Sequence, residues 1–322
     1  MLVVLASVEA ALFFVEDRLS LDLSHVGRIP LILQELKQAE PSHVLFLGNS
    51  LTREGIRPRT IENVWNEQSL PKAAIALVHP DDTGMPDWLY LYRRFVEPAD
   101  VDLDLLVVSF ANRNLEDTAP LNIERLGGRL GGFPVMREAF ARDISSAGDR
   151  IRYILSATFR LWADRERVQT RVLALIPGYE TFAQVANVTV RDGTSKGALH
   201  DPTYDRLGRF LEAARKKSST IVFVAVPTPG GYPLSDRLRD VIRDAGASLI
   251  DLRKVEGVNP GDFPDGYHLG PAGAVRFSEA LGRAIANATH LRSALLQRRA
   301  PLGYPTIEAS VPAHAAPADA FR

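Results

Sequence analysis

Five short, uninterrupted apolar runs constrain what this chain can fold into more than any other feature of its sequence. Runs of this kind, apolar on both faces, are typical of parallel strands that helices cover on both sides. Turn residues such as Pro41 and Gly48 bound the first run. The sequence therefore predicts five strands, over residues 43–47, 73–78, 103–110, 220–226 and 247–252.

Helical stretches separate these runs. Alternation of strands and helices favours an open α/β sandwich, in which right-handed crossovers join a parallel sheet of about five strands. In such a sheet ligands bind beyond the carboxyl ends of the strands, so functional residues are expected just after them. The predicted helices span residues 59–67, 85–95, 204–217, 234–245 and 272–288.

One connection is far too long for a loop. About residues 115–202 separate the third strand from the fourth, and a helical pattern lies within them at 151–169. We expect a largely helical insertion that packs over the strand ends as a lid. Two glycine pairs, Gly127–Gly128 and Gly131–Gly132, indicate either a hinge in that lid or merely a long loop. They are not a phosphate loop, because no strand leads in and no Lys-Ser or Lys-Thr follows.

The two ends of the chain differ from its middle. Residues 1–15 are nearly all apolar, but a spanning helix needs about 20 such residues, and this run carries Glu9. It is either an amphipathic helix or the remainder of a membrane anchor or signal segment, and we favour the second because Leu2 to Val8 shows no polar stripe. The Ala- and Pro-rich end predicts a disordered tail. The predicted organisation is an apolar segment over 1–25, a globular domain over 26–298 and a tail over 299–322.

Charge and composition exclude several classes of function. The 38 Lys and Arg residues balance 39 Asp and Glu residues, a net charge of -1, so no basic excess attracts the whole protein to nucleic acid. The chain has no cysteine, which removes disulfides, thiolate catalysis and cysteine metal sites. Its histidines show no zinc spacing, and the pair Asp81–Asp82 is interpreted as solvated. His79 is interpreted as a polar loop residue, with a place in the lining of the pocket as the alternative. We therefore expect no metal and no cofactor.

A serine follows the first predicted strand directly, in Gly48-Asn-Ser-Leu-Thr52. A serine on a tight strand-to-helix turn presents its hydroxyl at the sheet edge, where N–H groups at the helix start stabilise an oxyanion. Taken alone, Ser50 has a simpler interpretation as a helix cap or turn residue.

Two further segments carry candidate groups. In Asp265-Gly-Tyr-His268, the histidine can take a serine proton while the aspartate orients its ring, although a capped loop with a structural histidine is the alternative. After the third strand comes Phe110-Ala-Asn-Arg-Asn114, in which Asn112 can donate to an oxyanion or simply form a turn. Each segment lies at a predicted strand end, so the three together are more specific than any one.

These segments resemble the sequence blocks of the SGNH, or GDSL-type, hydrolase superfamily. Gly48–Thr52 is similar to its first block, and Asp265–Gly270 to its last, D-x-x-H. The strand running into Ala111-Asn112 is similar to its G-x-N-D block. The likeness covers most of residues 42–288 apart from the insertion, and the first block with its surroundings also resembles bacterial proteins of cell-envelope polysaccharide acetylation.

The resemblance implies a flavodoxin-like three-layer sandwich and a serine-dependent reaction. Ser50 would be the nucleophile, His268 the base and Asp265 its orienting partner. The resemblance also implies an oxyanion hole made of the Ser50 N–H, the Asn112 side chain and Gly84. This chain departs from the family pattern at three points. Asn49 replaces the usual Asp, and Ala111-Asn-Arg113 replaces the strict G-x-N-D, so Asn114 is an alternative to Asn112 as the donor. No spacing rule fixes Gly84.

Two functions from different classes follow. The first is an ester hydrolase or O-acyltransferase whose partner is an acyl ester or an acylated cell-envelope polysaccharide. We expect such an enzyme to be located in the bacterial cell envelope and to associate with the membrane through the apolar segment. A cytoplasmic location is also consistent with the sequence. The second is a non-catalytic binding or assembly protein that keeps the fold, which predicts a broken site. The first is favoured because Ser50, Asp265 and His268 are all intact.

Overall fold

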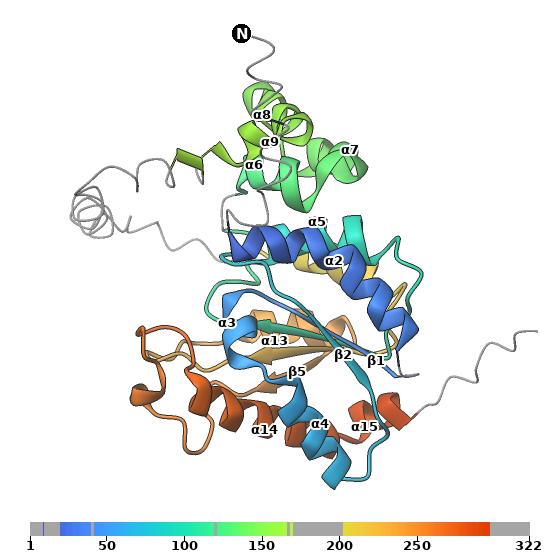
Figure 1. Ribbon diagram of the computed structural model, residues 1–322, viewed down its shortest axis with the longest axis vertical. Helices are drawn as coiled ribbons and strands as arrows, with labels where there is room; N and C mark the ends of the chain where they lie inside the picture. Colours follow the sequence, from blue (N-terminus) through green and yellow to red (C-terminus); the bar gives the residue numbers. More distant parts are fainter. Residues whose placement is uncertain are drawn as a thin grey trace, which may run out of the picture.

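The computed structural model contains a five-stranded parallel sheet with helices on both faces (Figure 1). It describes residues 9, 20–39, 42–118, 121–165, 168–169 and 202–296. The strand order is β2-β1-β3-β4-β5, the order of flavodoxin-like sheets. The predicted fold class is thus confirmed. The strands are β1 (His43–Leu47), β2 (Ala74–Val78), β3 (Leu105–Phe110), β4 (Ile221–Ala225) and β5 (Ser248–Asp251).

Neighbouring residues of each strand enter opposite cores. Leu45 and Leu47 of β1 belong to one buried cluster, whereas Val44 and Phe46 belong to another on the far face, because side chains alternate along a strand. All four of these side chains are fully buried. The continuous apolar runs in the sequence reflect this coverage on both faces.

Two helical layers provide that coverage. The first core lies under α2 (Leu21–Gln38), α5 (Met85–Leu91), its continuation η1 (Tyr92–Val96), α12 (Asp205–Ala214) and α13 (Asp236–Asp244). The second lies under α3 (Ser50–Gly55), α4 (Pro58–Glu67), α14 (Pro271–Asn287) and α15 (Thr289–Leu296). The short helix η3 (Pro260–Asp262) precedes the loop that carries His268. Each predicted strand and helix of the alternating pattern has its counterpart within a few residues.

Helix α2 is the main element that the sequence did not predict. It begins at Leu21, before the domain boundary expected at residue 25, and it packs along the outer strand β2. Its side chains at Val26, Ile29 and Leu33 are buried, but the helix also carries a proline at Pro30. A proline inside a helical pattern normally argues against a helix.

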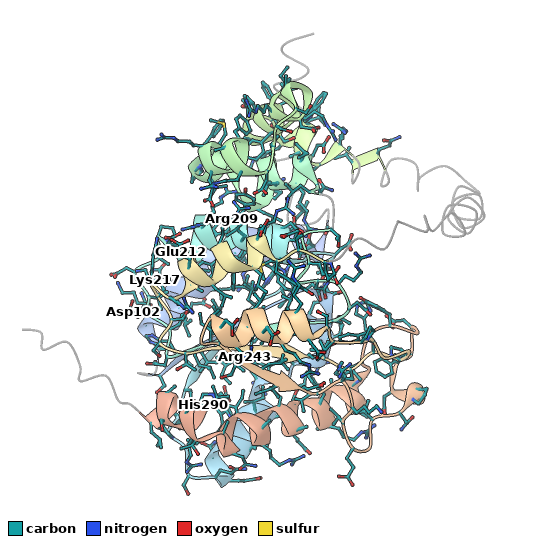
Figure 2. All side chains as sticks on the ribbon, turned by 180° about the vertical axis from the view of Figure 1, so that it is seen from behind. Asp102, Arg209, Glu212, Lys217, Arg243 and His290 are labelled. Atoms are coloured by element: carbon teal, nitrogen blue, oxygen red, sulfur yellow. The ribbon has the colours of Figure 1, made fainter. Side chains whose placement is uncertain are left out.

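The described part of the insertion is helical, as expected, but it does not pack where we expected. It contains α6 (Ile123–Arg125), η2 (Leu126–Leu130), α7 (Gly132–Arg142), α8 (Ala147–Thr158) and α9 (Arg160–Ala163). These helices stack on the outer side of the layer formed by α2, α5 and η1 (Figure 1), and the predicted lid over the strand ends is not seen in them. Arg209 of α12 lies at this boundary and pairs with Asp143 at 2.6 Å (Figure 2).

The glycine pairs are packing positions and not a hinge or a loose loop. A Cβ at Gly127 would lie 2.5 Å from the carbonyl oxygen of Tyr153, and one at Gly128 would lie 2.4 Å from the Cβ of Ala163. Helix η2 therefore approaches α8 and α9 at a distance that only glycine permits. The helical pattern predicted over 151–169 is interrupted, because Phe159 is extended and separates α8 from α9.

The remaining organisation is only partly visible. Most of the apolar segment over 1–25, the later part of the insertion and the tail over 299–322 lie outside the described residues. In the described part of the chain, no helix combines the length and the apolar character needed to cross a membrane.

Candidate active site

Ser50 stands on a sharp turn between β1 and α3. The preceding Asn49 caps α3 by accepting a hydrogen bond from the N–H of Leu51 at 3.0 Å. Gly48 allows the turn, since a Cβ there would lie 1.9 Å from Thr52 Oγ1 and 2.9 Å from Ser109 Oγ. The turn therefore brings the Ser50 hydroxyl to the carboxyl edge of the sheet at the start of a helix.

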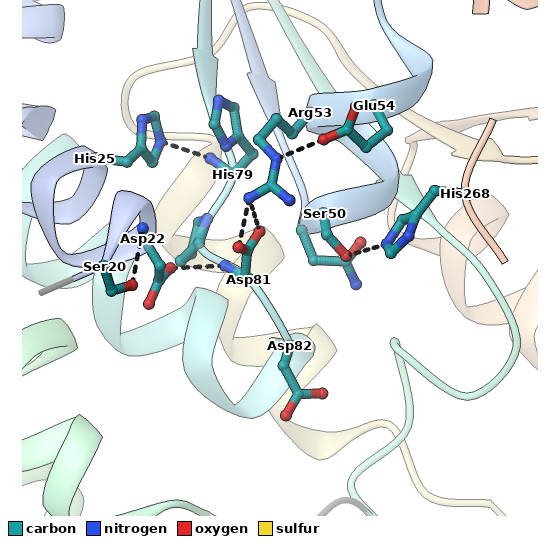
Figure 3. Close-up of polar contacts among 12 residues, drawn as sticks. Ser20, Asp22, His25, Ser50, Arg53, Glu54, His79, Asp81, Asp82 and His268 are labelled. Atoms are coloured by element: carbon teal, nitrogen blue, oxygen red, sulfur yellow. Dashed lines mark hydrogen bonds and ion pairs between the residues drawn. The ribbon is translucent and has the colours of Figure 1, made fainter. Parts of the chain in front are cut away.

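His268 and Asp265 meet Ser50 from a loop 218 residues further along the chain. His268 Nε2 lies 2.9 Å from Ser50 Oγ, and His268 Nδ1 lies 2.7 Å from Asp265 Oδ2. Figure 3 shows the imidazole of His268 facing the Ser50 hydroxyl. The three side chains that the sequence singled out are thus joined in one hydrogen-bonded chain.

Asp265 is held as a carboxylate by the loop that carries it. The backbone N–H of His268 donates to Asp265 Oδ1 at 2.7 Å, and that of Tyr267 donates to the same oxygen at 2.9 Å. These bonds, together with the His268 side chain, hold the pKa of Asp265 well below its usual range, with the His268 N–H as the largest cause. An ionised carboxylate only accepts, so His268 Nδ1 carries the proton and Nε2 is left to accept from Ser50.

The predicted oxyanion donors lie at the same edge of the sheet. Leu47 at the end of β1 pairs with Val78 of β2 and with Val108 of β3, which brings the loops after all three strands together. Ser50 is the first residue of α3, so its N–H has no acceptor within the helix. Asn112 is exposed and adopts a left-handed backbone conformation, φ 48°, which asparagine tolerates well.

The alternative, Asn114, is already engaged in its loop. Its Oδ1 accepts from the N–H of Ala111 at 2.9 Å, and its carbonyl oxygen accepts from the N–H of Met85 at 2.6 Å. Asn114 therefore ties the end of β3 to the start of α5. These bonds assign Asn114 a structural part, but they use its oxygens and not its Nδ2, so Asn114 stays an alternative to Asn112 as the donor.

Gly84 is a position that demands glycine. A Cβ there would lie 2.8 Å from the carbonyl oxygen of Asn114. Its N–H, however, is directed at the Asp87 carboxylate, 3.4 Å away, as part of the cap of α5. The Gly84 N–H can donate to an oxyanion only if it gives up this long hydrogen bond to Asp87.

The sequence did not predict the polar network behind the serine turn. Arg53, one helical turn after Ser50, forms an ion pair with Asp81, while the Asp81 N–H donates to Asp22 of α2 at 2.8 Å (Figure 3). Asp22 in turn pairs with Arg125 of the insertion at 3.0 Å, and both side chains are buried. Asp81 is thus a structural partner and not the solvated residue that we expected.

His79 lies in the loop after β2, as predicted, and its side chain also contacts α2. Its ring stacks on that of His25 of α2, with centroids 3.8 Å apart, and the His25 Nε2 accepts from the His79 N–H at 2.9 Å. Burial, followed by the neighbouring His79, lowers the pKa of His25 to about 4, so this pair is neutral. In the described residues, no group of three or more His, Asp and Glu side chains could hold a metal ion.

Comparison with known proteins gives a structural likeness and no sequence match. No protein-family model and no curated protein matches the chain. Among solved structures, it resembles Axe2. Axe2 is an acetylxylan esterase from Geobacillus stearothermophilus, 11% identical, and the alignment covers 77% of this chain and 95% of that chain at a TM-score of 0.38.

Two mutants of Axe2, described as acetyl-xylooligosaccharide esterases, give similar values. One is 11% identical at a TM-score of 0.37, and the alignment covers 77% of this chain and 95% of that chain. The other is 12% identical at a TM-score of 0.35, and the alignment covers 74% of this chain and 92% of that chain. Likeness at this level carries no information on function, which has to be argued from the side chains around Ser50.

Proposed function

We propose that this protein is a serine-dependent ester hydrolase or O-acyltransferase. The observation that carries the proposal is the hydrogen-bonded chain from Ser50 through His268 to Asp265, with links of 2.9 and 2.7 Å. A nucleophile within hydrogen-bond reach of a base, with the base oriented by a third group, is the geometry of an activated serine.

The proposed reaction has two halves. Ser50 Oγ attacks the ester carbonyl carbon while His268 Nε2 takes the hydroxyl proton, and the tetrahedral intermediate places negative charge on the former carbonyl oxygen. The Ser50 N–H and the Asn112 side chain are the proposed donors to that oxygen, with Gly84 as a third donor once it leaves Asp87. The intermediate then expels the alcohol, which receives its proton from His268, and an acyl group remains on Ser50.

The second half decides between hydrolysis and transfer. Water or a sugar hydroxyl attacks the acyl carbonyl carbon and gives its proton to His268, and the bond to Ser50 Oγ then breaks as His268 returns the proton to Ser50. We propose an acylated polysaccharide of the cell envelope as the substrate. An open site supports this choice, because the side chain of Asp265 is 54% exposed and Tyr267, beside His268, is 43% exposed. A polymer reaches such a site without entering a narrow cavity.

The alternative is a binding or assembly protein that keeps the fold without the reaction. That alternative predicts a serine and a histidine that have drifted apart, or an insertion that fills the site. Ser50 and His268 lie at hydrogen-bond distance, and the described helices of the insertion stack on another face. Both observations favour the enzyme.

Turnover of an activated acetate ester tests the proposal. Replacing Ser50 by Ala should abolish hydrolysis above the rate in buffer, whereas Ser293→Ala, at an exposed site on α15, should leave it unchanged. Adding acetylated and free oligosaccharides to the wild type then separates transfer from hydrolysis by the product formed. Equal turnover by wild type and Ser50→Ala would reject the proposed nucleophile.

A further inference from the structure

Helix α8 of the insertion presents apolar side chains to solvent. Tyr153 and Ser156 face inward and are buried, at 0% and 3% exposure. Ile151 and Ile154, three residues apart and so on one side of the helix, are 59% and 42% exposed. A helix on the surface of a globular protein normally places charged or polar residues at such positions.

The next helix continues this surface. Phe159, at the break between α8 and α9, is 49% exposed, and Trp162 of α9 is 38% exposed. The guanidinium of Arg165 lies 5.0 Å from the centre of the Trp162 ring. We name Ile151, Ile154, Phe159 and Trp162 the apolar tip, since α8 and α9 form the end of the molecule farthest from the sheet (Figure 1).

Glu9, the one residue before Ser20 that the structure describes, contacts α9 at the apolar tip. Glu9 accepts hydrogen bonds from the N–H groups of Arg160 and Leu161, the latter at 2.9 Å. Glu9 is the single charged residue in the apolar run over 1–15. Its carboxylate is therefore satisfied by the first turn of α9, while the apolar tip beside it stays exposed.

We propose that the apolar tip docks on the surface of an anionic phospholipid bilayer. The interface of a bilayer takes up exposed apolar side chains such as those of the apolar tip, and Glu9, which contacts α9, belongs in the sequence to an apolar run over 1–15 that is too short to span a bilayer. Tryptophan with a neighbouring arginine suits the interface, where the ring lies among acyl chains and the cation near headgroups. Residues 147–165 hold four arginines against two aspartates, and although Arg152 and Arg165 both pair with Glu124 at 2.7 Å, one added acidic side chain leaves this group with a net positive charge, which favours an anionic surface.

Trp162 makes the proposal directly measurable. The chain has three tryptophans, and the other two, Trp65 and Trp88, are 1% and 0% exposed. Brominated acyl chains quench only a tryptophan that they touch. Vesicles of phosphatidylcholine and phosphatidylglycerol with brominated chains should therefore quench the emission of the full-length protein, and Trp162→Phe should remove that quenching without preventing co-flotation.

Substitutions within the apolar tip separate its contribution from that of the amino-terminal run. Ile151→Ser combined with Ile154→Ser should weaken co-flotation with the same vesicles about tenfold or more, because two half-exposed apolar side chains no longer enter the lipid. Val275→Ser is the matched control, since Val275 is 40% exposed on α14 in the opposite layer.

Three results would overturn the proposal. The first is co-flotation with no quenching of Trp162, and the second is co-flotation that the double variant leaves unchanged, which assigns binding to the amino-terminal run alone. The third is a dimer seen by light scattering that the double variant dissociates, which assigns the apolar tip to a second copy of the chain.

Discussion

Asn49 donates through Nδ2 to the carbonyl oxygen of Thr83, 3.0 Å away. Its other amide atom, Oδ1, caps α3, so both ends of one buried side chain are used. This bond fixes the turn that carries Ser50 to the loop after β2, which contains Gly84. The relative position of the proposed nucleophile and the proposed oxyanion donors thus depends on an asparagine where the resembled family has an aspartate.

Asn49→Asp should therefore lower the stability and the activity of this protein, although the resembled family has an aspartate at that position. A carboxylate keeps the cap but cannot donate to Thr83, and it leaves two oxygens facing each other in a buried site. We expect the free energy of unfolding to fall by about 1–3 kcal/mol, measured by urea denaturation, with a parallel loss of kcat.

Asn259→Asp is the matched control. Asn259 caps η3 by accepting from the Gly261 N–H at 3.0 Å, and it is exposed. This substitution should change the stability little. Equal stability of Asn49→Asp and wild type would show that the Asn49–Thr83 bond does not hold the turn.

Gly84→Ala tests the close approach of two loops. The new Cβ would lie 2.8 Å from the carbonyl oxygen of Asn114, a backbone atom that cannot move alone. Overpacking of this kind destabilises by about 1–3 kcal/mol. Gly208→Ala, on α12 with open space around it, should instead stabilise by roughly 0.5–1 kcal/mol, and thermal unfolding distinguishes the two. A Gly84→Ala variant as stable as wild type would contradict the packing of these loops.

Much of the fold was predictable because its signals are local. The strands of this sheet are buried on both faces, so each appears in the sequence as a continuous apolar run. The hydrogen-bonded arrangement of Ser50, His268 and Asp265 was predictable for the same reason, since Ser50 follows a strand directly and Asp265 lies three residues before His268. Parallel strands then bring their carboxyl ends to one edge.

The network behind Ser50 was not predictable because its contacts depend on the tertiary arrangement. Arg53 meets Asp81 only after β1 pairs with β2, and His79 meets His25 only after α2 packs along β2. No spacing in the sequence indicates these pairs. Pro30 argues against a helix in the region where α2 forms, so α2 itself was not predicted. The direction of the Gly84 N–H likewise depends on Asp87, whose capping bond forms only when α5 does.

Asn112 should act on the chemical step. Asn112→Ala is expected to lower kcat by about 10²–10³ with little change in KM, because a donor to the oxyanion strengthens as charge develops. Asn112→Gly should give the same loss while fitting the left-handed backbone at φ 48° more easily, which separates the side chain from the fold. A larger loss of kcat in Asn114→Ala, at unchanged stability, would transfer the role to that residue.

Asp87 should make stability depend on pH. Burial raises its pKa to about 6, and its Oδ1 has no hydrogen-bond partner. The folded state therefore holds this proton more tightly than the unfolded chain, whose pKa is about 3.9. Its contribution to stability is full below about pH 4 and is lost as the pH rises through about 6.

The variant Asp87→Asn should remove that dependence. It keeps an oxygen to accept from Gly84 but carries no charge to bury. Its Tm should exceed that of wild type at about pH 8, and the difference should shrink or reverse near pH 4.5. A difference in Tm that stays constant across this range would show that Asp87 titrates normally.

The most direct test of the account is covalent labelling of Ser50 by a fluorophosphonate probe, located by mass spectrometry of the digested protein. An activated serine attacks such a probe without any knowledge of the natural substrate. We predict a single adduct on Ser50, which is lost in Ser50→Ala and forms much more slowly in His268→Ala and Asp265→Asn. A wild-type protein that remains unlabelled, or that labels equally well without His268, would contradict it.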